Sequence, residues 1–465
     1  MTGPVAAPLG VYLKRRNTEL ALCLVAALFG VGGFLITNLD RIGHLPRAWL
    51  PICLGWVAVC VAAHLLVRWR LPYADPILLP AALGLNGLGL AMIWRLDQDP
   101  PVSHMAGTQT LWTVLGVGLF AAVLIWLRDY RVLRRYPYLL FLAGLVLLLL
   151  PLLPGLGAAA NQANGSRIWI SLFGLSFQPA EIAKIVLALS FASYLVDHRD
   201  VLRMAGRRVA GVRTVRVRDF APVLVMWGAG VIVLVFENDL GTSLLFFGLF
   251  VMMLYVATEQ MRWVVLAGVL FVLAGVGAYE FIPHVRVRFD AWLNPFADRT
   301  QNGQLIASQY GLAWGGLFGT GWGLGQPNLV PLAQSDFIAS SLTEELGLTG
   351  LFAVILVYGF IVARGLRAGL TSRDEFGKLL ASGLSFTFAL QVFAIIGGVT
   401  RLLPLTGLTT PFMSQGGSSL VANWVIVAVL LVISHEGRRP LPAPAPVMAD
   451  LAGEATMQLP QVGVA

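Results

Sequence analysis

The sequence has 465 residues, of which 57% are hydrophobic and only 12% are charged, and its formal net charge is +8. A soluble protein carries about 25% charged residues, so this composition excludes an ordinary set of soluble domains and indicates an integral membrane protein. The positive charge does not imply a nucleic-acid partner, because basic residues of membrane proteins mostly lie in cytoplasmic loops.

The N-terminal region begins with a short basic segment and then becomes apolar. The first apolar run starts near Glu19, after Lys14, Arg15 and Arg16, and it is long enough to span a bilayer rather than to serve as a cleavable signal peptide. We therefore expect residues 1–18 to form a cytoplasmic tail. The three cysteines fall in apolar runs and should pack as small hydrophobic residues, without a disulfide or metal framework. They are Cys23, Cys53 and Cys60.

Twelve apolar stretches have roughly the length needed to cross a bilayer. Their approximate limits are 19–38, 50–67, 76–94, 110–127, 136–154, 180–197, 220–236, 241–258, 263–281, 346–363, 379–398 and 419–435. A soluble core helix would show a polar face, which stretches such as YLLFLAGLVLLLLPLL lack. Since a spanning segment must satisfy its own backbone hydrogen bonds, the sequence predicts an all-α polytopic membrane protein with about twelve transmembrane helices.

The charges of the loops predict the orientation of these helices. Arginine and lysine gather in the second, fourth, sixth and tenth loops and at the C-terminal end, whereas the third loop is net acidic and the fifth offers only Arg167. This alternation favours a cytoplasmic location for both termini. Residues 437–465 contain a proline-alanine run with little to bury, and we expect them to form a disordered cytoplasmic tail.

With that orientation, a segment of some sixty residues, 282–345, lies outside the membrane between the ninth and tenth helices. Loops of this length are uncommon unless they are functional, and this one holds the glycine-rich stretch GLAWGGLFGTGWGLGQP, suited to tight turns. Its charged residues are Arg286, Arg288, Asp290, Asp298, Arg299, Asp336, Glu344 and Glu345. The alternative is a solvated connector whose tryptophans lie in the interfacial aromatic belt. Those tryptophans are Trp292, Trp314 and Trp322.

Other charged residues lie at or within the membrane. Glu181 and Lys184 open the sixth helix three residues apart, so they share a face. Such charges usually mark a site or pathway, although a helix-start acid with a snorkelling lysine is the alternative. Asp239 either belongs to a site or is the N-cap of the eighth helix, and Arg401 either joins a site or anchors a helix end. Acids and cations beside apolar helices suit an amphiphile with a phosphate and sugar headgroup.

Four sequence blocks, taken together and in order, resemble the SEDS family (shape, elongation, division and sporulation), which includes RodA, FtsW and SpoVE. They are NGSRIWISLFGLSFQPAEIAKI at 164–185, ENDLGTSLL at 237–245, WLNPFAD with GGLFGTGWGLGQPNLVPLAQSDFIASSLTEELGLTG within 292–350, and GGVTRLLPLTGLTTPFMSQGGSSL at 397–420. The resemblance implies a ten-helix core over residues 75–436, including the loop 282–345. Residues 19–70 then form two additional N-terminal helices, an arrangement that resembles actinobacterial RodA-like members.

The resemblance also implies a function. Family members polymerise lipid II, the undecaprenyl-pyrophosphate-linked disaccharide, outside the bacterial cytoplasmic membrane, together with a class B penicillin-binding protein. Asp298 matches the acid to which the family's catalytic role is assigned, and it would be the general base for the acceptor hydroxyl. The departing pyrophosphate needs positive charge, from lysine and arginine or from a divalent cation, Mg²⁺ or Mn²⁺. The expected substrate-binding residues are Arg167, Glu181, Lys184, Asp239, Asp336, Arg401 and Ser418.

The chain departs from the family pattern near the expected catalytic acid. Arg299 replaces the usual proline, and the usual G-Y-Q motif is reduced to NGQ at 302–304. Ser335 stands for the usual threonine and Gln415 for a common tyrosine. Two other functions stay open at this point. One is a lipid II flippase that uses Glu181 and Lys184, and the other is a non-catalytic scaffold for the penicillin-binding protein.

Overall fold

A computed structural model describes residues 14–47, 49–99, 104–127, 129–153, 167–172, 175–203, 208–209, 212–213, 225, 227–230, 232–233, 239–300 and 302–440. In this part of the chain, ten helices are long and apolar enough to cross a membrane. The expected all-helical polytopic class is therefore confirmed. The spanning helices are α1 (Arg16–Thr37, continued by the π-helical turn η1, Asn38–Ile42), α2 (Trp49–Arg70), α3 (Leu78–Asp97), α4 (Met105–Trp126), α7 (Pro179–Arg203), α9 (Leu240–Thr258), α10 (Met261–Phe281), α13 (Ile338–Thr371), α14 (Glu375–Val399) and α15 (Gly417–Arg438).

Two of the twelve expected spans differ from the others. The fifth is the shorter apolar helix α5 (Pro137–Leu149), extended by the 3₁₀ turn η3 (Leu150–Leu152). The seventh, 220–236, lies mostly outside the described residues, of which 225, 227–230 and 232–233 are helical. The three cysteines are buried and free, as expected from their apolar surroundings.

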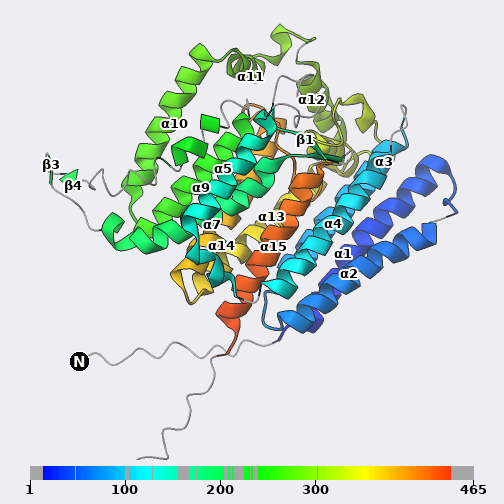
Figure 1. Cartoon of the computed structure of the whole chain (residues 1–465). Coiled ribbons are helices and arrows are strands. Elements are labelled where there is room, and N and C mark those ends of the chain that lie inside the picture. Colours follow the sequence, from blue (N-terminus) through cyan, green and yellow to red (C-terminus); the bar gives the residue numbers. More distant parts are fainter. Residues whose placement is uncertain are drawn as a thin grey trace, which may run out of the picture.

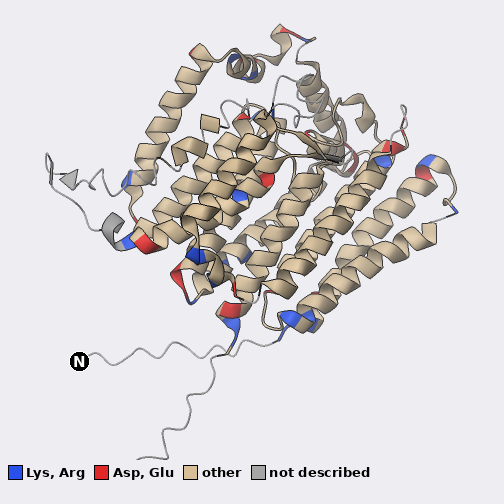
Figure 2. Cartoon of the chain, in the orientation of Figure 1, with Lys and Arg blue, Asp and Glu red and all other residues tan. Residues whose placement is uncertain are grey.

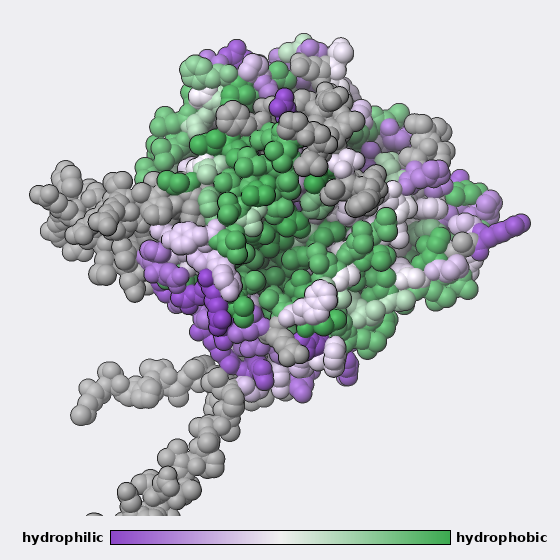
Figure 3. Space-filling model, in the orientation of Figure 1, coloured by the Kyte–Doolittle hydropathy of each residue, from purple (hydrophilic) through white to green (hydrophobic). Residues whose placement is uncertain are grey.

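Helix α15 lies at the centre of the bundle and α10 at its edge (Figure 1). Trp424 of α15 is fully buried, with Phe120 and Phe412 packed edge-on against it at centroid distances of 5.4 Å. Helix α10 contributes no buried residue and leans away from the bundle (Figure 1). Charged residues gather toward the ends of the helices (Figure 2), and the surface between them is largely hydrophobic (Figure 3). This distribution fits a bundle with a lipid-facing belt.

The long loop between the ninth and tenth spans contains four helical segments. They are α11 (Pro283–Leu293), the 3₁₀ turn η4 (Pro295–Ala297), α12 (Gly303–Gly315) and the 3₁₀ turn η5 (Pro327–Leu329). At the same end of the molecule, β1 (Ile170–Leu172) and β2 (Leu175–Phe177) form an antiparallel hairpin that leads into α7. Elsewhere, η2 (Tyr130–Arg135) precedes α5, and β3 (Arg208–Val209) pairs with β4 (Val212–Arg213).

The last part of this expected loop, residues 338–345, is helical and forms the beginning of α13, which starts at Ile338. Glu344 and Glu345 lie inside that helix and are buried, although their charge suggested a loop. The helix can include them because their carboxylates accept hydrogen bonds from backbone amides and an arginine. A kink follows at Gly347, whose φ of 72° lies in the left-handed region that favours glycine.

Candidate functional site

Glu181 and Lys184 form a buried ion pair in the first two turns of α7. Lys184 Nζ lies 2.6 Å from Glu181 Oε2 and donates to Gln391 Oε1 of α14 at 3.0 Å. Only 5% of Glu181 and 3% of Lys184 is exposed. The expected shared face is confirmed, and a lysine that snorkels to the interface is inconsistent with this burial. Pro179 at the start of the helix suits a position that needs no backbone donor.

Asp239 lies beside this pair and is the N-cap of α9, so the predicted capping role is confirmed. Its Oδ1 accepts from the Thr242 amide at 2.9 Å, and its Oδ2 accepts from Gln178 Nε2 at 3.2 Å. Burial raises the pKa of Asp239, the hydrogen bonds from Thr242 oppose that rise, and the nearby charge of Glu181 adds to it. Three carboxyl and amide side chains thus converge where α7 and α9 begin.

Arg288 of α11 supplies a second cation to this region. Its Nη1 donates to the carbonyls of Leu405 and Thr406, at 3.3 Å and 3.0 Å, in the connection between α14 and α15. Burial raises the pKa of Asp336, and the positive charge of Arg288 acts in the opposite direction on both Asp336 and Asp239. Burial also lowers the pKa of Arg288 itself. Arg288 is therefore a positive centre shared by two partly desolvated acids.

Arg401 anchors the C-terminal end of α11. Its Nη2 donates to the Trp292 carbonyl at 2.9 Å, and Trp292 Nε1 donates back to the Arg401 carbonyl at 2.9 Å. Arg401 has a φ of 60°, a left-handed conformation that is uncommon for residues other than glycine. These contacts favour the anchoring alternative for Arg401 and place it next to the segment that carries Asp298.

Asp298 is exposed on the short connection between η4 and α12. Its Oδ1 accepts from the Thr300 amide at 3.0 Å, and its carbonyl accepts from the Asn302 amide at 3.0 Å where α12 begins. Asn302 Nδ2 also donates to the Pro295 carbonyl at 3.0 Å. The connection is thus held from both sides, which gives an exposed carboxylate a defined place above the helices.

The remaining expected site residues lie on other parts of the same end. Ser418 is buried in the first turn of α15, and its hydroxyl has no hydrogen-bond partner among the described residues. The connection before it is tied to the Asp336 segment, since Ser414 Oγ donates to the Ser335 carbonyl at 2.7 Å. Arg167 is exposed just before β1. No group of three or more His, Cys, Asp or Glu side chains in the described ranges could hold a metal ion.

Three polar residues of this region were not predicted from the sequence. Gln391 interrupts an otherwise apolar span, a pattern that could have marked it. Gln178 belongs to the QPAE motif, but a neutral side chain next to the charged Glu181 and Lys184 gives no separate signal of a role in the site. Arg288 offers no local signal, because its approach to Asp239 and Asp336 depends on how α11 is placed over the bundle.

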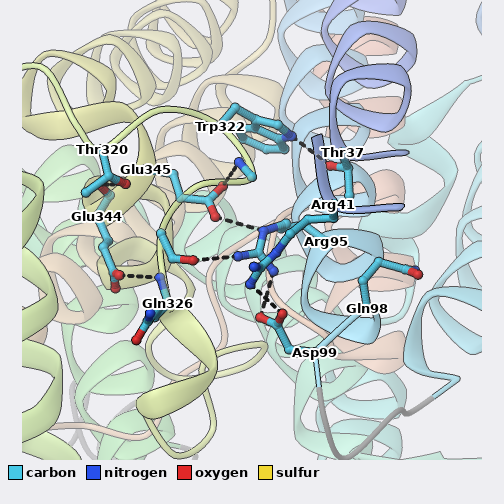
Figure 4. Close-up of polar contacts among 12 residues, drawn as sticks. Thr37, Arg41, Arg95, Gln98, Asp99, Thr320, Trp322, Gln326, Glu344 and Glu345 are labelled. Carbon is cyan, nitrogen blue, oxygen red and sulfur yellow. Dashed lines mark hydrogen bonds and ion pairs between the residues drawn. The ribbon is translucent and has the colours of Figure 1, made fainter. Parts of the chain in front are cut away.

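A second buried polar cluster holds the glycine-rich segment, residues 315–326 (Figure 4). Arg95 of α3 is fully buried, with Nε 2.9 Å from Glu345 Oε1 and Nη1 2.7 Å from Asp99 Oδ2. Its Nη2 donates to the Gly325 carbonyl at 2.8 Å. Glu345 Oε2 accepts from the Gly323 amide at 2.9 Å. These bonds join the glycine-rich segment to two spanning helices.

Comparison with known proteins identifies the family. The model of a family described as "Cell cycle protein", which covers FtsW, RodA and SpoVE, matches residues 77–439. "Peptidoglycan glycosyltransferase RodA" of Mycobacterium tuberculosis (strain ATCC 25618 / H37Rv) is 46% identical over 450 residues, covering 95% of this chain and 96% of the relative. "Stage V sporulation protein E" of Bacillus subtilis (strain 168) is 34% identical over 326 residues, covering 70% and 85%.

Solved structures have a similar fold. One, described as "Structural coordination of polymerization and crosslinking by a peptidoglycan synthase complex", matches with a TM-score of 0.64 and 26% identity, covering 79% of this chain and 99% of that one. The crystal structure of the rod shape determining protein RodA of Thermus thermophilus matches with a TM-score of 0.56 and 25% identity, covering 79% and 98%. The chain therefore belongs to the family of FtsW, RodA and SpoVE.

Proposed function

We infer that the protein is a peptidoglycan glycosyltransferase that polymerises lipid II at the outer face of a bacterial cytoplasmic membrane. The observation that carries this inference is the 46% identity, over 95% of the chain, to a relative named for that activity. Asp298 lies in the NPFAD block that matches the family's catalytic acid, and its exposure supports access by a sugar hydroxyl.

The reaction displaces a lipid pyrophosphate from an α-linked anomeric carbon and forms a β-1,4 bond. A single displacement inverts the anomeric centre and needs a general base for the acceptor 4-hydroxyl. Asp298 takes this role, accepting the hydroxyl proton as the new carbon–oxygen bond forms and the pyrophosphate leaves with its electron pair. Two hydrogen bonds support a fixed position for the carboxylate. The Thr300 amide donates to its Oδ1, and the Asn302 amide donates to the backbone carbonyl of Asp298.

Lys184 and Arg288 are the proposed cations for the departing pyrophosphate. Lys184 is ion-paired with Glu181 and donates one hydrogen bond, to Gln391, and its ammonium group carries three hydrogens, so it has donor capacity for a phosphate oxygen. Glu181, Asp239, Asp336 and Ser418 are proposed to orient the headgroup. Arg401 positions α11, and Arg167, exposed just before β1, adds a third positive charge.

We also propose that the chain has twelve transmembrane helices, with both termini in the cytoplasm. Helix α5 and the segment 220–236 complete the ten described spans. Arginine-rich loops meet at the end opposite α11 and α12, where Arg134 lies 2.6 Å from Asp197 and Arg199 lies 2.7 Å from Glu375. This charge distribution supports a cytoplasmic location for that end.

Reconstitution with lipid II as the only substrate tests the proposed function. Purified full-length protein should convert lipid II into glycan strands, resolved by gel after removal of the lipid. Movement of labelled lipid II across the bilayer without strand formation would favour the flippase alternative. A requirement for the protein only as a stabiliser of a penicillin-binding protein would favour the scaffold.

The charge of Arg288 predicts a shift in the pH dependence of polymerisation. Arg288→Gln removes a positive charge that lowers the pKa of Asp239 and Asp336, so both acids should take up protons at a higher pH. The acid limb of the pH–rate profile should therefore move to higher pH. Arg286→Gln, an exposed change two residues earlier on α11, is the control and should leave the limb in place. An unshifted limb in Arg288→Gln would separate Arg288 from the ionisation that limits the rate.

A class B penicillin-binding protein is the proposed partner, supported by the fold shared with a chain of a peptidoglycan synthase complex. We predict that docking of this partner on the outer face orders the loop 282–345 and raises the polymerisation rate, because ordering each residue costs about 1–2 kcal/mol of backbone entropy. Hydrogen exchange of this segment and polymerisation rate should both change when the partner is added. Equal exchange and equal rates in both states would contradict activation and leave the glycosyltransferase assignment intact.

A further inference from the structure

Helices α1 and α2 precede residues 77–439, the span matched by the family model, yet α1 is hydrogen-bonded to the glycine-rich segment at the end where the site lies. We propose that the C-terminal end of α1, with η1, is a clasp that positions the glycine-rich segment and thereby Asp298. The clasp consists of Gly33, Thr37, Asp40 and Arg41. The proposal rests on the proposed function and adds positioning residues to it.

Trp322 connects the glycine-rich segment to α1 (Figure 4). Its Nε1 donates to the Gly33 carbonyl at 3.0 Å and to Thr37 Oγ1 at 2.9 Å. A Cβ atom on Gly33 would lie 3.1 Å from Trp322 Cζ2 and 2.7 Å from Ala91 Cβ of α3. Glycine at position 33 therefore creates the space in which the indole lies between α1 and α3. This placement is specific, unlike that of a tryptophan in an interfacial belt.

Arg41 of η1 makes a second connection through an alternating set of charges. Arg41 Nη2 lies 2.5 Å from Asp99 Oδ1, and Asp99 Oδ2 lies 2.7 Å from Arg95 Nη1. Arg95 in turn holds the Gly325 carbonyl and the Glu345 carboxylate. Asp99 and Arg95 are buried, so their charges interact with little screening. Removal of Arg41 would leave Asp99 with one cation in place of two.

The turn η1 also lies close to the glycine-rich segment. A Cβ atom added to Gly323 would lie 3.5 Å from Asp40 Cβ, at van der Waals distance, so there is room for only about one methyl group between them. Turns of π-helix are rare and frequently occur at functional positions. Here the widened turn places Asp40 near Gly323 and Arg41 against Asp99, at the end of a helix that otherwise packs in the bundle.

The glycine-rich segment has little intrinsic rigidity, so its contacts decide its position. Four of its glycines have positive φ, with 52° at Gly316, 83° at Gly319, 103° at Gly321 and 85° at Gly323. Glycine loses more conformational freedom on ordering than any other residue. Helix α13 holds one side of the segment, because the backbone amides of Thr320 and Gly321 donate hydrogen bonds of 3.0 Å to carbonyl oxygens of α13. The clasp holds the side facing α1.

The position of the glycine-rich segment is transmitted to Asp298 by α12. This helix begins at the Asn302 N-cap, bonded to the Asp298 carbonyl, and ends at Gly315, where the segment begins. Gly315 packs so closely on α13 that a Cβ atom there would lie 2.1 Å from the Thr343 carbonyl. A helix moves largely as a unit, so a shift at residue 315 changes the placement of residue 298.

Two single substitutions and their combination in the full-length protein test the clasp. Trp322→Phe keeps an aromatic ring and removes the indole donor, and Arg41→Gln removes the cation near Asp99. Each should lower kcat for lipid II polymerisation about fivefold, the equivalent of one lost hydrogen bond, with KM nearly unchanged. Hydrogen exchange should increase in residues 303–326 and stay unchanged in α7 and α14. Arg41→Lys should recover most of the lost kcat.

Matched controls separate positioning from general stability. Trp314→Phe changes an exposed tryptophan of α12 that is 77% accessible. Arg68→Gln changes an arginine at the C-terminal end of α2, far from the clasp, where Arg68 donates a hydrogen bond of 3.1 Å to Asn17. Both should behave as wild type. A folded Trp322→Phe/Arg41→Gln protein with wild-type kcat and exchange would overturn the clasp, as would equal losses in the controls. If wild-type protein forms no glycan, the proposed function fails, and the exchange measurement still decides the clasp.

Discussion

Replacing Asp298 with asparagine should lower lipid II polymerisation about 10²–10⁴-fold and leave the membrane fold intact. The asparagine amide is nearly isosteric with the carboxylate. Its oxygen can still accept the hydrogen bond from the Thr300 backbone amide, which is 3.0 Å long in the wild-type protein. It cannot take a proton from the acceptor hydroxyl, so only positioning and charge stabilisation by other residues would remain. The measurement is the initial rate of glycan formation by protein that elutes as a single folded species.

The matched control is Asp290→Asn, a second exposed acid eight residues earlier on α11. Its Oδ1 accepts from the Tyr279 hydroxyl at 3.1 Å, so the change removes a charge near the same surface without touching the η4 connection. Asp290→Asn should retain most of the activity. Near-normal turnover by Asp298→Asn, or an equal loss in both variants, would contradict a specific role for Asp298 as the base.

The membrane spans could be predicted from the sequence because hydrophobicity is a local property. The expected limits of α1 and α9 lie within three residues of the observed ones. The start of α13 could not be found this way. Glu344 and Glu345 look like loop residues until Arg95, more than two hundred residues earlier, is brought against Glu345. Burial of a charge depends on its partners, and distant partners leave no local pattern.

The residues of the site also fall into those that the local sequence predicts and those that depend on distant partners. The spacing of Glu181 and Lys184 puts them on one helical face, so their pairing could be expected from the sequence. Asp239 could be expected as an N-cap for a similar reason. Arg288 and Trp322 were ordinary members of a long polar loop, since their partners lie in α9, in the segment before α13 and in α1. Only the three-dimensional placement of α11 and of the glycine-rich segment distinguishes them from exposed neighbours.

The Glu181–Lys184 pair should show strong energetic coupling in stability as well as activity. Removal of one member strands the other inside the bundle, at a cost of about 3–5 kcal/mol. The two alanine variants should not be equal. Lys184 keeps Gln391 as a partner when Glu181 is removed, whereas Glu181 is left facing Asp239 when Lys184 is removed. Lys184→Ala should therefore be the more destabilised variant.

A double-mutant cycle measures this coupling, with thermal unfolding of each variant in the same detergent or lipid. Glu181→Ala with Lys184→Ala should destabilise the protein by less than the sum of the single changes. The control is the Arg134–Asp197 pair, which involves the same α7 but is 45% and 43% exposed. Exposed pairs contribute about 0.2–1 kcal/mol, so its coupling should be small. Additive losses at Glu181 and Lys184 would show that the two charges are stabilised separately, and a Glu181→Ala variant less stable than Lys184→Ala would argue against the repulsion between Glu181 and Asp239.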